Sequence, residues 1–406
     1  METIDSRRVL LPVSVATGLS LLGDTAMYTV LPTHYAEVGV ALGTIGILLS
    51  ANRFVRLLLN APIGLLTDRW PRRRIFVPST FLGVLSTAIY AIVPGFGLLL
   101  AGRLLWGIAW AGIWVSGNAI VLDATMTEDR GRGVGIYQFS FFLGAASGSI
   151  LGGILTDWLG YRLAMGLAAS LSLLGAFVAL LILPETKNTR PSMSNSEMIG
   201  INTNKQTNWP QLTSATSVYG INRLVVAGVL VATFGLFLNQ QLGDIITIGM
   251  ISIGVATITG VGLGTSTLIA MVAAPSAGAI SDKIGSRWAV TGSGLLSGTA
   301  GFILLSIGYP FTIFLGLPMI SVASGSNQSL STALFGDLSP PKVHGRRLGI
   351  LYTVGDLASA IGPPLAYALM PIIGLAVLYQ MSAVLFGMML VLALWWGTRT
   401  RTRLPN

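Results

Sequence analysis

The sequence predicts an all-α membrane protein in which twelve transmembrane helices form two six-helix bundles related by a parallel repeat. Three observations lead to this prediction. Only 10% of the 406 residues are charged, whereas a soluble protein carries about 25%. Runs of about 20 apolar residues, each long enough to cross the hydrocarbon core of a bilayer, recur along the chain. The two halves also match at a single offset. Soluble enzymes, nucleic-acid modules and disordered proteins are excluded.

The twelve spans are apolar runs bounded by turns and charges. The only long polar stretch is rich in Asn, Thr and Ser, which is typical of a flexible linker. We therefore expect an N-terminal bundle (1–184), a cytoplasmic linker (185–221) and a C-terminal bundle (222–406). The expected spans are 9–32, 40–66, 75–94, 98–122, 134–156, 162–183, 222–243, 251–280, 287–307, 310–336, 347–370 and 374–397.

The positive charges indicate the orientation. With this topology, 20 of the 24 Lys and Arg residues lie on one face of the membrane. The positive-inside rule places that face, both termini and the linker in the cytoplasm. The net charge of +9 is thereby explained by topology and by contact with the bilayer, without nucleic acid. Arg7 and Arg8 precede a long apolar run with no cleavage site, so this run reads as the first span of an integral plasma (bacterial inner) membrane protein.

The two halves repeat at an offset of 214 residues. Two six-helix halves related as parallel repeats are a transporter plan, with the substrate site at the interface of the halves. The matching pairs are Gly64 with Gly278, Asp68 with Asp282, Arg73 with Arg287, Asp123 with Asp337, Arg132 with Arg346, Gly135 with Gly349 and Gly148 with Gly362.

At these residues the chain resembles the major facilitator superfamily. The loop from Gly64 to Arg74 resembles the superfamily signature G-x-L-x-D-R-x-G-R-[KR], with Pro71 at the usual glycine, and the second copy keeps Gly285 there. Arg103 with Gly107 resembles the R-x-x-x-G pattern of the fourth span. The run from Pro184 to Thr186 resembles the P-E-[ST] that closes the sixth span. The resemblance implies the major facilitator fold and transport by alternating access, not an enzyme.

The fifth span adds a subgroup signal. Its glycines resemble the motif of drug–proton antiporters, with Ser149 where that motif has proline; this implies multidrug efflux. On one interpretation, the glycines allow tight packing of span five against span eight, or of span two against span eleven. On the other, they form a bend that determines to which side of the membrane the transporter opens. The residues of this helix-packing motif are Gly135, Gly144, Gly148, Gly152 and Gly153, with Gly362 and Pro363 as the counterpart in the eleventh span.

The loop motif implies a gate. By the resemblance, Asp68 reaches the N-terminal end of the eleventh helix, where the helix dipole favours a carboxylate, and latches the halves on the cytoplasmic side. Asp282 would do the same against the fifth helix near Arg132. For Arg72 and Arg74 we favour the alternative that they only fix topology. The predicted gating residues are Gly64, Asp68, Arg69, Arg73, Asp123, Arg132, Gly278, Asp282, Arg287, Asp337 and Arg346.

Five ionisable residues lie inside the spans, where they are costly and usually functional or paired. They are Asp24, Arg53, Arg56, Arg103 and Asp356, and the repeat reproduces none of them. This asymmetry places the coupling chemistry in the N-terminal half. Asp24 is a candidate proton carrier, because in general burial raises the pKa of a carboxyl group and a nearby arginine lowers it. The alternative is a permanent ion pair with Arg53 or Arg103. Asp356 is a second coupling candidate.

Further polar and aromatic residues complete the predicted substrate cavity. Tryptophans after Arg103 could stack on a substrate or pack against lipid and helices. Uncharged amides could orient a substrate by hydrogen bonds or bridge helices. Three arginines against two acids hint at an anionic or zwitterionic amphiphile. The predicted cavity residues are Asp24, Tyr28, Arg53, Arg56, Arg103, Trp110, Trp114, Asn239, Gln240, Asn327 and Gln328.

The leading hypothesis is a proton-coupled antiporter that exports a small amphipathic organic compound. The alternatives are an importer or facilitator of an organic anion, and a lipid transporter or flippase. We expect no metal and no cofactor: the chain has no cysteine and no Walker motif, so the proton gradient is the expected energy source. The expected partners are a small-molecule substrate, protons and the bilayer, with the protein acting as a monomer.

Overall fold

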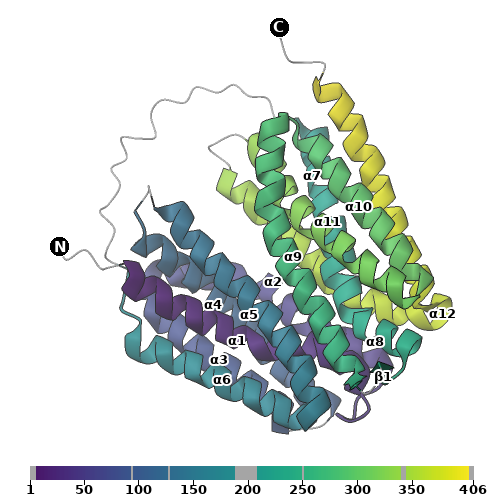
Figure 1. Ribbon diagram of the computed structural model, residues 1–406. Helices are drawn as coiled ribbons and strands as arrows, with labels where there is room; N and C mark the ends of the chain where they lie inside the picture. Colours follow the sequence, from purple (N-terminus) through teal and green to yellow (C-terminus); the bar gives the residue numbers. More distant parts are fainter. Residues whose placement is uncertain are drawn as a thin grey trace, which may run out of the picture. The chain divides into compact units, whose positions relative to one another are not determined.

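The computed structural model describes residues 6–92, 95–126, 129–187, 208–248, 251–339 and 344–401. The fold is helical, as the sequence predicts, and divides into two compact units (Figure 1). The first unit contains Met1–Ile201 and Asp244–Gly264. The second contains Asn202–Gly243 and Thr265–Asn406. The division therefore differs from the expected boundaries, because a segment that follows the seventh span groups with the N-terminal unit.

The N-terminal unit is a bundle of six long helices, one for each of the first six predicted spans. Helix α1 packs mainly against α5 and α6, and α3 packs against α4 and α6. Gly160 joins α5 to α6 with a φ of 83°, a conformation that glycine adopts without strain. The helices are α1 (Ser6–His34), α2 (Ile45–Arg69), α3 (Arg72–Ile92), α4 (Phe96–Ala124), α5 (Arg130–Leu159) and α6 (Tyr161–Ile182), with a short 3₁₀ turn η1 (Leu42–Thr44).

An antiparallel hairpin and the first turns of α9 (Val255–Ile284) also belong to the N-terminal unit. Strand β1 (Ile245–Ile248) pairs with β2 (Ile251–Gly254). The eighth span was expected to start at 251, so these residues are a correction. Their β-branched isoleucines and threonine fit a strand better than a helix.

The C-terminal unit contains the remaining spans. The seventh span is one continuous run of α7 (Trp209–Asn222), a π-helical segment η3 (Arg223–Leu230) and α8 (Val231–Leu242). The rest of α9 is followed by α10 (Arg287–Ile307), α11 (Pro310–Asp337) and α12 (His344–Arg401). Helix α12 breaks at Gly374, where φ is 79°, so it supplies the eleventh and twelfth spans.

Ten helical stretches of the described residues are long and apolar enough to cross a membrane. One of them, Arg347–Arg399, is 53 residues long and is divided at Gly374. Helix α11, which has 28 residues, is also long enough to span, although its serines and Asn327 make it more polar. These helices account for the twelve predicted spans.

Helix α7 corrects the expected linker. It begins at Trp209, whereas the sequence analysis extended the linker 185–221 up to the bundle 222–406. The local signals were present: the Asn208 side chain accepts a hydrogen bond from the Gln211 N–H at 3.3 Å, and Pro210 lies in the first turn. Both are typical of a helix N-terminus.

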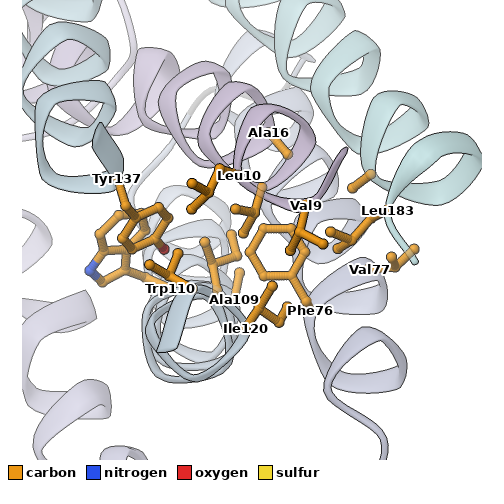
Figure 2. Packing of buried hydrophobic residues seen from close by; sticks show 14 of the residues in the cluster. Val9, Leu10, Ala16, Phe76, Val77, Ala109, Trp110, Ile120, Tyr137 and Leu183 are labelled. Atoms are coloured by element: carbon orange, nitrogen blue, oxygen red, sulfur yellow. The ribbon is translucent and has the colours of Figure 1, made fainter. Parts of the chain in front are cut away.

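The core of the N-terminal unit packs aliphatic and aromatic side chains from five helices, α1, α3, α4, α5 and α6 (Figure 2). Val9 and Leu10 of α1 lie against Phe76 of α3, with Trp110 of α4 and Tyr137 of α5 at one side of the cluster. All five are buried. This cluster fixes α4 between α1 and α3, and α4 carries the buried arginine of the candidate site.

The glycines of the fifth span allow backbone contact between α5 and α1. A Cβ on Gly144 would lie 2.7 Å from the Gly18 Cα, and one on Gly148 would lie 2.8 Å from the Leu22 Cα. Gly152 meets Ala26 in the same way. The motif thus packs mostly against the first helix, a pairing that the sequence analysis did not consider. Gly135 has open space around it.

The C-terminal unit has a comparable crossing. A Cβ on Gly362 of α12 would lie 2.5 Å from the Gly228 Cα in η3. Gly148 therefore meets Leu22, but its repeat partner Gly362 meets Gly228. The 214-residue offset, which relates Gly148 to Gly362, does not relate Leu22 to Gly228, so the first and seventh helices follow a different offset.

Glu185 explains why the sixth helix ends in Pro-Glu-Thr. Its carboxylate accepts hydrogen bonds from the Arg72 N–H at 2.9 Å and the Arg73 N–H at 3.1 Å. These are the first two residues of α3, whose N–H groups lack partners within the helix. The ammonium group of Lys187 donates to the Arg69 carbonyl at the end of α2. The end of α6 thus clamps the loop between α2 and α3.

We predict that Gly148→Ala destabilises the protein by about 1–3 kcal/mol, the usual cost of overpacking, because backbone atoms of Leu22 occupy the space. Gly135→Ala on the same helix is the matched control and should leave stability unchanged or slightly raised. Thermal unfolding in detergent measures both. Equal shifts for the two variants would contradict the packing described for α1 and α5.

We also predict that Glu185→Ala lowers the free energy of unfolding by about 1 kcal/mol, the typical value of a lost N-terminal cap. Glu37→Ala, which removes an exposed carboxylate between α1 and α2, serves as the control. Unfolding of both variants in the same detergent is the measurement. A neutral Glu185→Ala would show that the clamp contributes nothing to stability.

Candidate functional site

A buried ion pair lies at the centre of the N-terminal unit. Arg103 of α4 is 0% exposed, and its Nη1 donates to the Asp24 carboxylate of α1. Its Nε donates to the Leu48 carbonyl at 2.9 Å, and its Nη2 donates to the Tyr28 hydroxyl at 3.0 Å. The guanidinium group is therefore held by groups from two helices besides its carboxylate partner.

Gly107 explains the R-x-x-x-G pattern of the fourth span. It lies one turn after Arg103, and a Cβ there would sit 2.6 Å from the Val55 Cβ and 2.7 Å from the Asn52 carbonyl oxygen. Only a glycine lets α4 approach α2 this closely. That approach carries the Arg103 guanidinium to the carbonyl groups of α2.

Tyr28 connects the two arginines of the site. Its hydroxyl donates to the Leu49 carbonyl at 2.7 Å. The Cζ atoms of Arg53 and Arg103 each lie 5.0 Å from its ring centroid, within the range of cation–π attraction. Arg53 is only 9% exposed. The structure thus brings together Asp24, Tyr28, Arg53 and Arg103, four of the residues predicted from the sequence.

Asn52 is a member of the site that sequence reasoning missed. Its Nδ2 donates to Asp24 Oδ1 at 3.4 Å, and the side chain is buried. The available signal was an amide beside Arg53 in an otherwise apolar run. Arg56 lies about one turn further along α2 and is partly exposed.

The site has no equivalent among the repeat positions of the C-terminal unit. Leu317 stands at the repeat position of Arg103, and Thr267 at that of Arg53. A cluster that combines one carboxylate with two arginines is therefore specific to the N-terminal unit. Its net charge is positive when all three groups are ionised.

Asp356, the second coupling candidate, has a different environment. Its Oδ1 lies 3.8 Å from Arg223 Nη2, and the two side chains are 16% and 25% exposed. This pairing with Arg223 was not predicted from the sequence. The pair joins the first half of α12 to η3, and a coupling role for Asp356 stays a prediction.

The tryptophans of α4 stack on one another within the N-terminal unit. Ring centroids are 5.8 Å apart for Trp106 and Trp110 and 5.6 Å apart for Trp110 and Trp114. The ring centroid of Trp114 lies 5.7 Å from that of Tyr137 of α5. Trp110 is 5% exposed and belongs to the core (Figure 2). Trp110 and Trp114 thus pack against α5, which is the helix-packing alternative left open by the sequence, whereas Arg103 contacts α1 and α2. A role of these tryptophans in lining the cavity stays a prediction.

The predicted amide lining is not one surface either. Asn239 and Gln240 lie at the end of α8, while Asn327 lies within α11 and is 0% exposed. Neither polar atom of the Asn327 side chain has a hydrogen-bond partner within the described chain. Gln328 is exposed. Asn222, which was not predicted, donates to the Ser324 carbonyl at 3.2 Å and ties α7 to α11.

The loop motif forms a similar ion pair in each unit. In the N-terminal unit, Arg72 Nε lies 3.2 Å from Asp123 Oδ2. In the C-terminal unit, Arg287 pairs with Asp337 and also with Asp282, the latter at 3.3 Å. Each pair ties the start of one helix to the end of the next. Arg72 was expected only to fix topology, so its pairing is a correction.

Other members of the predicted gate are placed as follows. Arg73 donates to the Leu180 carbonyl instead of pairing with Asp123. Asp68, Arg69 and Arg132 are exposed. A Cβ at Gly64 or Gly278 would meet open space, and the Arg346 side chain lies outside the described residues. The latching role of Asp68 and Asp282 stays a prediction.

Comparison with known proteins agrees with this architecture. An uncharacterised MFS-type transporter of Methanocaldococcus jannaschii is 24% identical, with 91% of this chain and 93% of that protein covered. The class B tetracycline resistance protein of Escherichia coli is 26% identical over 86% of this chain and 85% of its own length. A bacterial homologue of the human lysosomal transporter Spinster, solved inward-facing and occupied, superposes with a TM-score of 0.80 at 17% identity, covering 96% of both chains.

The family model described as Major Facilitator Superfamily matches residues 13–249 and again residues 212–406. The two matches correspond to the two halves that the internal repeat relates. Together they cover most of the chain. The protein is an integral membrane transporter that belongs to the major facilitator superfamily.

Proposed function

We propose that this transporter is a proton-coupled antiporter that exports a small amphipathic organic compound by alternating access. The observation that carries the proposal is the buried pair of Asp24 and Arg103, whose arginine is 0% exposed and has Leu317 at its repeat position in the other half. A carboxylate in a membrane span is costly unless it is paired.

The geometry supports a proton-binding role for Asp24. When Asp24 takes up a proton, Arg103 loses its charged partner but keeps the Leu48 carbonyl and the Tyr28 hydroxyl. The guanidinium group therefore stays in position while the charge of the site changes by one. A substrate that competes for Arg103 or Arg53 would favour protonation of Asp24, and loss of that proton would favour substrate release.

Export is supported by two observations. The chain is similar along most of its length to a tetracycline resistance protein. The fifth helix carries the glycine pattern of drug–proton antiporters, and these glycines are in backbone contact with α1, the helix that carries Asp24. We infer further that the protein lies in the plasma membrane, with its termini and basic loops in the cytoplasm. Asp68 and Asp282 then act as latches on the cytoplasmic side.

An organic-anion facilitator is the second candidate. Arg53 and Arg103 both lie on the ring of Tyr28, and Asp24 offers one negative charge against two positive charges. Such a site favours a carboxylate or phosphate on the substrate. A facilitator would move this anion without consuming the proton gradient, so proton dependence separates the two candidates.

We predict that Asp24→Asn abolishes substrate-dependent dissipation of a pH gradient in proteoliposomes. The probes are a panel of amphipathic anions and cations added to liposomes that carry an internal pH dye. Asn keeps the size of Asp24 and one acceptor oxygen for its donors but cannot carry a proton. A compound that collapses the gradient with wild type but not with Asp24→Asn also reveals the charge class of the substrate.

Glu37→Gln is the control for this assay, because it neutralises an exposed carboxylate outside the spans. Asp356→Asn is assayed separately, because Asp356 is the second coupling candidate and also pairs with an arginine. Equal dissipation by Asp24→Asn and wild type would make Asp24 a structural partner of Arg103. Substrate binding without dissipation in the wild-type protein would favour the facilitator.

Arg103→Leu should destabilise the protein by about 3 kcal/mol, because it leaves Asp24 without its charged partner. We take the low end of the usual range since the Asp24 side chain is still 13% exposed. The double variant Asp24→Asn/Arg103→Leu should recover part of this loss. Thermal unfolding of the two single variants and the double variant gives the coupling, and strictly additive losses would contradict a direct pair.

A further inference from the structure

The end of α5 that lies away from the basic loops holds the first turn of α9. The Thr257 N–H donates to Asp157 Oδ2 at 2.6 Å. Thr257 is the third residue of α9, so its N–H is among the first four of the helix, which have no carbonyl partner within it. The carboxylate also lies where the helix dipole favours a negative charge. Asp157 is thus a cap supplied by another helix.

The two helices touch along three turns next to this cap. A Cβ on Gly153 would lie 2.8 Å from the Ala256 carbonyl carbon, and one on Gly264 would lie 2.9 Å from the Ala146 carbonyl oxygen. Between them, Gly260 meets the backbone of Ser149. Small residues at four-residue spacing let the backbones approach. This contact is the expected packing of spans five and eight, and it lies in the second half of α5.

The hairpin before α9 is shaped around the same carboxylate. The Val255 N–H donates to the Asp244 carbonyl at 2.9 Å, which ties the first residue of α9 to the residue that precedes β1. A Cβ on Gly254 would overlap the carboxylate of Asp157. Glycine at position 254 is therefore required for the carboxylate to reach the end of α9.

The cap lies at the end of the helices opposite the loop motif. Helix α5 starts at Arg130 and ends two residues after Asp157, and α9 starts at Val255 and runs to the second copy of the motif at Asp282. The repeat does not reproduce the cap: Pro371 stands at the repeat position of Asp157, and its side chain cannot accept a hydrogen bond. The chain has this acceptor in one half only.

We propose that Asp157 is a positioning residue that latches the outer ends of α5 and α9 and releases them once in each transport cycle. The inference rests on the alternating-access transport proposed above. Helix α9 begins in the N-terminal unit and continues in the C-terminal unit, so a grip on its first turn restrains the segment that links the two. A single charge-assisted hydrogen bond is strong enough to bias this end toward closure and weak enough to break in each turnover.

The test is the accessibility of a single cysteine. The native chain has no cysteine, and Ala256, which is 0% exposed, can be replaced by Cys as a reporter. The protein is purified in detergent, and the rate of labelling by a hydrophilic maleimide is measured without substrate and without a pH gradient. Asp157→Leu should raise this rate about fivefold, the factor that a carboxylate at a helix N-terminus contributes.

Three further variants make the result specific. Gly254→Ala leaves Asp157 in place but displaces its carboxylate, so it should raise labelling in the same way even where Asp157→Leu fails to fold. Asp157→Asn keeps an acceptor for the Thr257 N–H but loses the charge, so its labelling rate should lie between those of wild type and Asp157→Leu. Asp129→Leu removes an exposed acid at the opposite end of α5 and should change nothing.

Wild-type labelling in both Asp157→Leu and Gly254→Ala would overturn the latch. A rise of equal size in Asp129→Leu would also overturn it, because it would show a general loosening of the bundle. The experiment uses neither substrate nor protons. Failure of the proposed antiport would therefore appear in the pH-gradient assay and leave these labelling rates unchanged.

Discussion

The burial of Arg103 is the constraint on which the N-terminal unit depends. A guanidinium group that is 0% exposed inside a membrane bundle needs a partner for its charge and acceptors for its N–H groups. Asp24, Tyr28 and the Leu48 carbonyl provide them. These groups come from two helices, so α1, α2 and α4 can assemble in only one register. The candidate coupling site and the packing of the unit thus share one set of contacts.

Backbone contact at glycines is what makes this assembly possible. Gly107 brings α4 against α2, and the glycines of α5 bring it against α1 on one face and α9 on another. In a bilayer there is little hydrophobic gain from helix association, so close backbone approach carries much of the stability. The same glycine run that defines the fifth span therefore connects the helix of the proton-binding candidate to the helix held by Asp157.

The fold class and the ionisable members of the site were predictable because both depend on rules that act locally. Apolar length indicates a span, and a charge within a span indicates a function or a partner, which identified Asp24 and Arg103. Other features depend on tertiary direction. The sequence spacing of Trp110 and Trp114 places them on nearly the same face of α4 as Arg103. What they touch depends on how α4 packs against α5, and the sequence spacing does not show that packing. The start of α7 at Trp209 was missed because the polar residues of its first two turns, Gln211, Thr213 and Ser214, resemble a linker.

Protonation of Asp24 inside the folded transporter is the central claim, and infrared difference spectroscopy tests it most directly. Spectra of the wild-type protein are recorded as the pH is lowered, and the band of a protonated carboxyl group is followed. We predict a band that is absent in Asp24→Asn and retained in Asp356→Asn. A band of unchanged intensity in Asp24→Asn would contradict the account and leave Asp24 as a permanently ionised partner of Arg103.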